Sequence, residues 1–458
     1  MIAPSLPPLD VYRLWVRAGH GRAVLVTNPD VPQDYKDEII HYSLNDYRLD
    51  RQFGCFAGRF NIELATRAGI REQLRDALIE AEFEEEEMVE KDRTLRFRTL
   101  AVFAESGDDR SLAHLQKLVA ENEPQALESY VEALVYLSKK GQDWAFDELT
   151  DYVRKSNEDA FYELSYYIPR GIIWLAEHAD EVITVGNYWK LDEDLGPENK
   201  DFKDVPRDLL ARLEAARDKA KEEFQRTFVR EPRPVYVPSD KGVLADLLAG
   251  IVPRRLVPQA APMLTEEDHL EVARRWLVEE DWETAIKLFE VIEKRGFPLP
   301  LSELIARVRS GFHPCCFEDV LEEINDPAIR ELGLELVQDE DDFAVGIESL
   351  TKSVLPEDLD LLLPAATEFV LGNTGSQQEE HSVTFAFRDM AKHLPQEAAI
   401  RALVWVYENT GCGACRGYAL EELVDDHDYD VSDWLEEMQY DTCSDVCEVA
   451  EKLKSGGR

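Results

Sequence analysis

The chain has 458 residues, and its 51 Lys and Arg against 94 Asp and Glu give a formal net charge of −43. Hydrophobic residues make up 44% of it, which is enough for a sizeable core and excludes a wholly disordered acidic protein. No run of about 18 apolar residues occurs, so no membrane span is expected. The charge also argues against direct binding to duplex nucleic acid, because phosphate contacts need clustered Lys and Arg.

The amino-terminal residues have neither a basic start nor a long apolar stretch, so no secretory signal is expected. Seven cysteines, an odd number, then favour reduced thiols and a cytoplasmic location. Extreme acidity is also typical of halophile proteins, but the acidity here is uneven. Residues 263–458 hold 45 acidic and 16 basic residues, a net of −29, which leaves −14 for residues 1–262.

Most segments repeat their apolar residues at the helical period. In chain order, residues 22–27 are the one strand candidate, although they fit the end of a helix equally well. A helix is expected after residues 107–109, where Leu112, Leu115 and Leu118 repeat, and others over 126–137 and 144–153. A highly charged helix is expected over 204–227, and helical periodicity resumes at residue 265.

Six prolines lie in residues 232–262, and because proline fixes φ and removes a backbone donor, this stretch is expected to be largely extended. We therefore expect an N-terminal helical lobe (1–231), a proline-rich connector (232–262) and an acidic C-terminal helical lobe (263–458).

The sharpest local pattern is a helix start at Asp326-Pro327, because Asp caps a helix N-terminus and Pro suits the first helical position. Ile329 and Leu332 are expected to be buried, and Arg330 to bridge to acidic groups of a neighbouring unit. An Asp-Pro-x-Ile-Arg start is typical of the second helix of HEAT-type repeats, whose helix pairs of about 40 residues stack into a solenoid.

Residues 402–416, which include Tyr407-Glu408-Asn409-Thr410-Gly411-Cys412-Gly413-Ala414-Cys415-Arg416, resemble a segment of uncharacterised bacterial HEAT-repeat proteins. Residues 440–446 are similar to the start of the last helix of the same proteins, with Cys447 here in place of Arg and Met438 where a Cys often precedes. Cys55, Arg59 and Glu63-Leu64 match an N-terminal pattern of that group more faintly. The resemblance implies an all-α fold of HEAT-like helical pairs, an armadillo-like α-solenoid in two lobes.

Four cysteines form the only zinc candidate, Cys412, Cys415, Cys443 and Cys447, since zinc favours tetrahedral thiolates and CxxC turns. The alternative is that they are small buried residues at helix contacts, which is the commoner use of cysteine and leaves no metal or cofactor predicted. A disulfide oxidoreductase would need a thioredoxin-like context that is absent here.

Three weaker patterns have structural interpretations that are preferred. His313-Pro314-Cys315-Cys316 fits a loop into a helix over 317–324, and Asp425–Asp430 fails as an EF-hand because its sixth position is not Gly. The run Glu84–Glu87 is expected to be an exposed helix surface. Arg275, Trp276 and Trp282 suit either a recognition surface or core filling, of which core filling is commoner.

No phosphate loop, nucleophile elbow or zinc-protease motif occurs, so an enzyme is not favoured. We expect a non-enzymatic interaction scaffold that binds a basic protein partner through an acidic helical-repeat surface, since such a surface steers a basic partner. Residues 421–450 contain twelve acids and no Lys or Arg. The expected contacts within them are Asp425, Asp426, Asp428, Asp430, Glu436 and Glu437, although a solubilising end cap would explain the same acids.

Two other classes of function remain open at this stage. The acids could imitate nucleic acid in an inhibitor of a basic DNA- or RNA-binding protein. An enzyme on HEAT-like repeats, of the lyase or glycosylase kind, is the other alternative, although the net charge of −43 opposes a DNA glycosylase. The sequence does not predict the oligomeric state.

Overall fold

The computed structural model describes residues 5–45, 57–81, 89–121, 127–155, 164, 169–184, 206–227, 235–312, 314, 316–372 and 377–455. All regular secondary structure in these residues is helical, which confirms the all-α prediction. Of the strand candidate 22–27, residues 22–26 form helix α2 and Thr27 is its C-cap. Ala23, Val24 and Val26 of this short helix are buried and belong to the core of unit 1.

The described chain divides into two compact units. Unit 1 comprises residues 1–229, 411–414 and 431–458, and unit 2 comprises residues 230–410 and 415–430. The helices of unit 1 are α1 (Leu9–Ala18), α2 (Arg22–Val26), α3 (Gln33–Leu44), α4 (Ala57–Arg67), α5 (Arg71–Glu80), α6 (Val89–Glu105), α7 (Asp109–Glu121), α8 (Leu127–Lys139), α9 (Asp143–Arg154), α11 (Pro169–Glu177), α12 (Ala179–Val182), α13 (Arg207–Thr227), η7 (Ser432–Trp434), α26 (Leu435–Met438) and α27 (Ser444–Lys454).

The helices of unit 2 follow in order after residue 235. They are α14 (Val243–Leu248), η4 (Arg254–Leu256), α15 (Val257–Ala260), η5 (Ala261–Met263), α16 (Glu266–Trp276), α17 (Trp282–Arg295), α18 (Leu301–Arg309), α19 (Phe317–Glu322), α20 (Pro327–Leu336), α21 (Phe343–Ser349), η6 (Pro356–Asp358), α22 (Leu359–Gly372), α23 (Gln377–Ala391), α24 (Gln396–Asn409) and α25 (Gly413–Asp425).

In unit 1, helices that follow one another along the chain pack together. Helix α6 lies between α4 and α8, α8 packs against α9, and α11 packs against α13. The helices expected near residues 112–118, 126–137, 144–153 and 204–227 are therefore present, as α7, α8, α9 and α13. An apolar face of Leu209, Leu210, Leu213 and Ala216 is expected on α13. Leu210, Leu213 and Ala216 are buried there, and Leu209 is half-buried.

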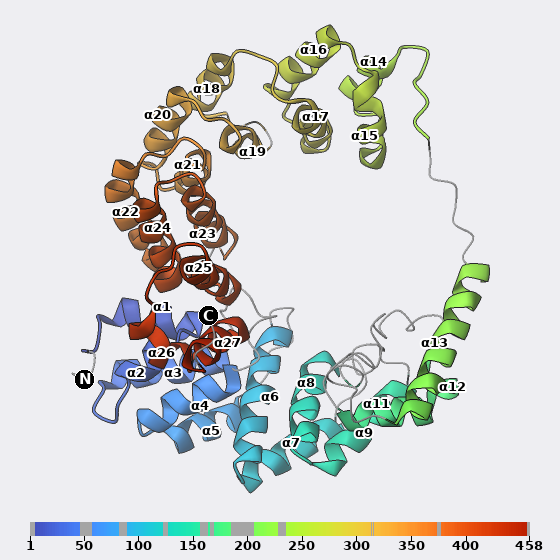
Figure 1. Cartoon of the computed structure of the whole chain (residues 1–458), viewed down its shortest axis with the longest axis vertical. Helices are drawn as coiled ribbons and strands as arrows, with labels where there is room; N and C mark the ends of the chain where they lie inside the picture. The colour runs from blue at the N-terminus through green and yellow to red at the C-terminus, as the bar shows by residue number, and fades with distance from the viewer. Residues whose placement is uncertain are drawn as a thin grey trace. The chain divides into compact units, whose positions relative to one another are not determined.

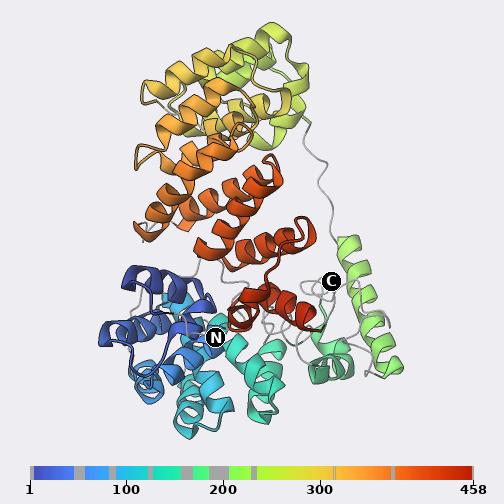
Figure 2. The same ribbon diagram turned by 60° about the vertical axis from the view of Figure 1, so that its left-hand side comes forward.

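The C-terminal segment of the chain packs against its N-terminal helices within unit 1 (Figures 1 and 2). Helix α26 contacts α2, and the backbone N–H of Thr442 donates to the carbonyl of Gly19 at 3.0 Å. Residues 411–414 and 431–458 therefore group with residues 1–229 and not with the rest of residues 263–430, which differs from the expected C-terminal division. The reason lies in contacts between residues far apart in the sequence, such as Arg22 and Glu437, which are 415 positions apart. Helical periodicity does not encode such contacts.

In unit 2, successive helices alternate between two rows (Figure 1). In one row α21 contacts both α19 and α23, and in the other α22 contacts α24. The rows are joined by the pairs α20–α21 and α23–α24. Because α19, α21 and α23 lie in the same row, side chains on these three helices can lie on the same surface of unit 2.

The proline-rich segment is extended only over residues 235–239 among those described. From residue 243 it folds into α14, η4, α15 and η5, so the prediction of a largely extended connector is wrong there. Proline is tolerated in a first helical turn, and Pro258 and Pro262 occupy that position in α15 and η5. Leu247, Val257 and Ala260 then fill the core of unit 2.

The predicted helix start at Asp326-Pro327 is confirmed. The Asp326 carboxylate accepts from the N–H of Ala328 at 2.8 Å, and Pro327 opens α20. Ile329 and Leu332 are buried, as expected. Arg330 donates from Nε to Asp358 at 2.8 Å, and Asp358 lies in η6 at the start of the next helix pair. This contact is the expected bridge between neighbouring pairs.

Candidate functional site

Four carboxylates gather on α19 and α21 of unit 2. Glu318, Asp319 and Glu322 lie within two turns of α19, and Glu348 lies on the adjacent α21. Glu318, Glu322 and Glu348 are half-buried, whereas Asp319 is exposed. We call these four residues the carboxylate cluster.

Loss of contact with water raises the pKa of every member of the carboxylate cluster, including Asp319, which is exposed as a residue but whose carboxyl group is partly shielded. It raises the pKa of Glu318 to about 7, helped by repulsion from Asp319 and Glu348. The pKa of Glu322 also rises to about 7, through burial and then repulsion from Asp319 and Glu348. Burial is likewise the main cause that raises the pKa values of Asp319 and Glu348. At neutral pH the cluster therefore carries protons that ordinary carboxylates would have lost.

The acidic character extends to the helices on either side of the cluster. Glu293 on α17 repels Asp319, and Asp389 on α23 repels Glu322. The hydroxyl of Ser382 on α23 hydrogen-bonds Glu348 and partly offsets the rise in its pKa. At the α17 end, Asp319 also borders a cleft that contains Arg254, Arg255 and Lys294, and basic residues therefore bound the acidic surface there.

A second acidic feature of unit 2 is a cleft of about 570 Å³ lined by residues of α21, α22 and α23 and of the turn after α20. Phe343 and Phe369 stack there with ring centroids 4.6 Å apart. None of the described residues that line this cleft is Lys or Arg, and four are acidic: Glu340, Asp341, Glu368 and Glu379. An aromatic floor with a carboxylate rim suits the aliphatic stem and charged head of a Lys or Arg side chain.

Of the six acids predicted as partner contacts, five are exposed. Asp425, Asp426, Asp428 and Asp430 lie at or after the end of α25, and Glu436 lies on α26. Glu437 does not fit that prediction. It is 6% exposed and accepts two hydrogen bonds from Arg22, because the C-terminal segment is packed on α2.

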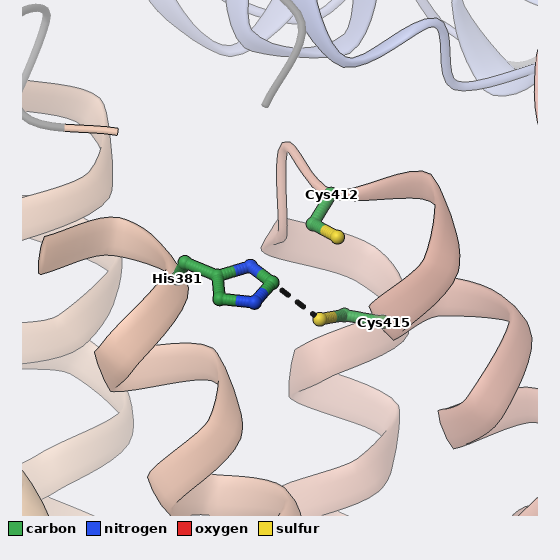
Figure 3. Close-up of side chains that lie close together, drawn as sticks. All are labelled: His381, Cys412 and Cys415. Carbon is green, nitrogen blue, oxygen red and sulfur yellow. Dashed lines mark hydrogen bonds between the residues drawn. The ribbon is translucent and has the colours of Figure 1, made fainter. Parts of the chain in front are cut away.

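The structure brings His381, Cys412 and Cys415 together (Figure 3). Their ligand atoms all lie within 4.8 Å of one another, and His381 Nδ1 lies 3.8 Å from Cys415 Sγ. His381 comes from α23, whereas both cysteines lie at the start of α25. Cys412 and Cys415 are buried, and His381 is half-buried.

A buried arginine follows the two cysteines in the sequence. Arg416, next to Cys415, is fully buried and donates to the carbonyl of Thr410 at 3.1 Å. The group of His381, Cys412 and Cys415 offers two sulfur donors and one imidazole nitrogen.

Cys443 and Cys447 do not belong to this group, so two of the four cysteines considered as a zinc candidate lie outside it. The thiol of Cys447 donates to the carbonyls of Met438 and Asp441 at 3.3 and 3.4 Å, and Cys443 is buried before α27. Their role is to pack the C-terminal segment. The five cysteines in the described residues are thiols, as expected.

The remaining sequence candidates take structural roles where they are described. Cys316 precedes α19, Trp276 is fully buried as core filling, and Arg275 pairs with Glu279 at 2.6 Å. Trp282, in contrast, is 66% exposed at the start of α17. Four other candidates lie outside the described residues: Cys55, His313, Cys315 and the run 84–87.

Sequence reasoning missed two sets of functional candidates. His381 lies on α23, a different helix from the CxxC turn, so no local spacing connects it with Cys412 and Cys415. The four residues of the carboxylate cluster could not be distinguished in the sequence from the other acidic residues, because the chain contains 94 Asp and Glu. The cluster's only sequence signal is the i, i+4 pair Glu318 and Glu322, which places both side chains on one face of a helix.

Comparison with known protein families, with curated proteins and with solved structures finds no match for this chain. Among the described residues, no helix is both long enough and apolar enough to cross a membrane.

Proposed function

We propose that this protein is a cytoplasmic, non-enzymatic scaffold of HEAT-like helical pairs, arranged as an α-solenoid in two lobes, that binds a basic protein partner. The alternation of helices between two rows in unit 2 supports the repeat architecture. The Asp326-Pro327 start and the Arg330–Asp358 bridge between successive pairs support it as well.

The carboxylate cluster is the observation that carries the proposal. Carboxylates that are partly removed from water and that repel one another destabilise the fold when they ionise. A Lys or Arg side chain placed among them would remove this cost, because an opposite charge at about 4–6 Å favours the ionised carboxylate. The cluster is thus better suited to a cationic ligand than to solvent.

Two further acidic surfaces support the same class of partner. The cleft beside Phe343 offers an apolar floor for a basic side chain, and the exposed acids of 425–430 would steer a cation by long-range attraction. Glu436 belongs to the steering set, whereas Glu437 does not, because it is buried on Arg22.

The test measures the affinity of a fluorescent decalysine peptide for the full chain by anisotropy at low and moderate salt. The proposal predicts that E318Q/D319N/E322Q/E348Q weakens binding about tenfold or more at low salt and flattens its salt dependence. The matched control changes four exposed acids outside the cluster, E222Q/E267Q/E303Q/E397Q, and carries the same change in formal charge.

The control variant separates a specific surface from bulk charge. If both variants lose the same affinity, the peptide responds to net charge alone and the proposed site is wrong. If neither loses affinity while circular dichroism shows both folded, the cluster does not bind cations.

A further inference from the structure

We propose that His381, Cys412 and Cys415 form a three-ligand binding site for a thiophilic divalent metal ion, with Zn²⁺ as the expected occupant. The donor set, two sulfurs and one imidazole nitrogen, is among those that zinc prefers. Three protein ligands also leave one tetrahedral position for water or for a group from outside the chain.

The distances are close to those of a bound zinc ion. Zn–S bonds of about 2.3 Å and Zn–N bonds of about 2.0–2.1 Å in a tetrahedron put neighbouring ligand atoms about 3.5–3.8 Å apart. His381 Nδ1 and Cys415 Sγ are already 3.8 Å apart, and the three ligand atoms lie within 4.8 Å of one another. Closure onto an ion therefore needs side-chain shifts of about 1 Å or less.

The balance of charge suits a buried site. Two thiolates and a neutral imidazole neutralise Zn²⁺, so that the loaded site has no net charge to desolvate. Both cysteines are at most 2% exposed.

A plain thiol–imidazole hydrogen bond would show the same 3.8 Å separation. The two explanations differ in their prediction for the number of donors. A hydrogen bond uses only His381 and Cys415, whereas a metal site also uses Cys412, the third member of the group. Replacement of Cys412 thus separates them.

Metal binding would tie α23 to the turn that opens α25, on either side of α24 in the chain. The ion would clamp two consecutive helix pairs of the repeat. The structure assigns it a stabilising role, and the open fourth position allows a donor from a partner to complete it.

The test uses the full chain, reduced and stripped of metal, titrated with Co²⁺ and then Zn²⁺. We expect one Co²⁺ per chain, with thiolate-to-cobalt charge-transfer absorption and the intense visible bands of tetrahedral cobalt, and displacement by one Zn²⁺. C412S, C415S and H381N should each weaken binding by about 100-fold or more, whereas C443S and C447S should leave it unchanged.

Three outcomes would overturn the proposal. They are no thiolate-to-cobalt absorption from the folded, reduced wild-type chain, undiminished binding by C412S, and cobalt binding lost in C443S or C447S instead. The first of these measurements uses only the wild-type chain, so the proposal can be refuted even if a variant fails to fold. Failure here would leave the decalysine experiment unaffected, since none of these residues belongs to the carboxylate cluster.

Discussion

Arg22 and Glu437, which are 415 positions apart in the sequence, form a bidentate ion pair in unit 1. Nε and Nη2 of Arg22 each donate to a different carboxylate oxygen at 2.9 Å. The side chains are 19% and 7% exposed, so the pair is largely shielded from water. It fastens the C-terminal segment to the second helix of the chain.

Glu437→Gln should lower the free energy of unfolding of unit 1 by about 1–3 kcal/mol. The amide keeps the shape but leaves a buried guanidinium without its counter-charge. Limited proteolysis and denaturant unfolding measure the effect, and we expect faster release of the C-terminal segment. The control Glu436→Gln changes an exposed neighbour and should be neutral. Equal proteolysis of the two variants would contradict the structural role of the pair.

Gly21→Ala should destabilise unit 1 by about 2–4 kcal/mol, because a methyl group there overpacks a backbone contact. A Cβ on Gly21 would lie 1.8 Å from the carbonyl oxygen of Glu437, which cannot move without displacing α26. The comparison variant is Gly372→Ala, since a Cβ there meets no atom within 4 Å. Thermal melting should show a marked loss for the first and almost none for the second. A tolerated Gly21→Ala would mean that the C-terminal segment is not packed there.

Asp326→Ala should cost about 1 kcal/mol, the usual cost of a lost N-cap, because it removes the hydrogen bond to the N–H of Ala328. The neighbouring exposed Asn325→Ala is the control. Denaturant unfolding of both variants checks whether the Asp-Pro start stabilises α20, and equal stabilities would show that it does not.

The stability of unit 2 should fall as pH rises from about 4.5 to about 7. In this window the folded state holds protons on Glu318 and Glu322 that the unfolded state has released, because their pKa values are raised to about 7. E318Q/E322Q imitates the protonated forms. It should therefore be more stable than the wild type at pH 8, by about 1–3 kcal/mol after solvent screening, and equal to it near pH 4.5.

The pH experiment needs a variant that changes two ordinary carboxylates. E267Q/E303Q serves, since both residues are exposed on α16 and α18. Denaturant midpoints at several pH values give the difference from wild type, which should depend on pH only for E318Q/E322Q. The raised pKa values would be refuted by a constant difference for both pairs.

The helices were predictable wherever local physics decides them. The cap at Asp326, the buried Ile329 and Leu332, and the apolar face of α13 follow from side chains a few residues apart. The helices within residues 243–263 were not predicted, because from the sequence alone a proline in the first turn of a helix cannot be told from a proline that ends a helix.

The candidate sites were predictable only in part, for a different reason. The CxxC turn is local and was found, whereas His381 reaches it from another helix, and Glu437 reaches Arg22 across nearly the whole chain. Such contacts depend on how the helices stack, which cannot be predicted from the local pattern of a single sequence. The raised pKa values of the carboxylate cluster likewise depend on burial and on repulsion between residues of α19 and α21.

The central claim, that the carboxylate cluster binds a basic partner, is tested most directly by proton release. Decalysine is titrated into the full chain by calorimetry at pH 7 in two buffers of different ionisation enthalpy. A cation bound among Glu318 and Glu322 lowers their pKa values from about 7, so we expect about one proton released per peptide and almost none from E318Q/D319N/E322Q/E348Q. Binding without proton release from the wild-type chain would contradict the account.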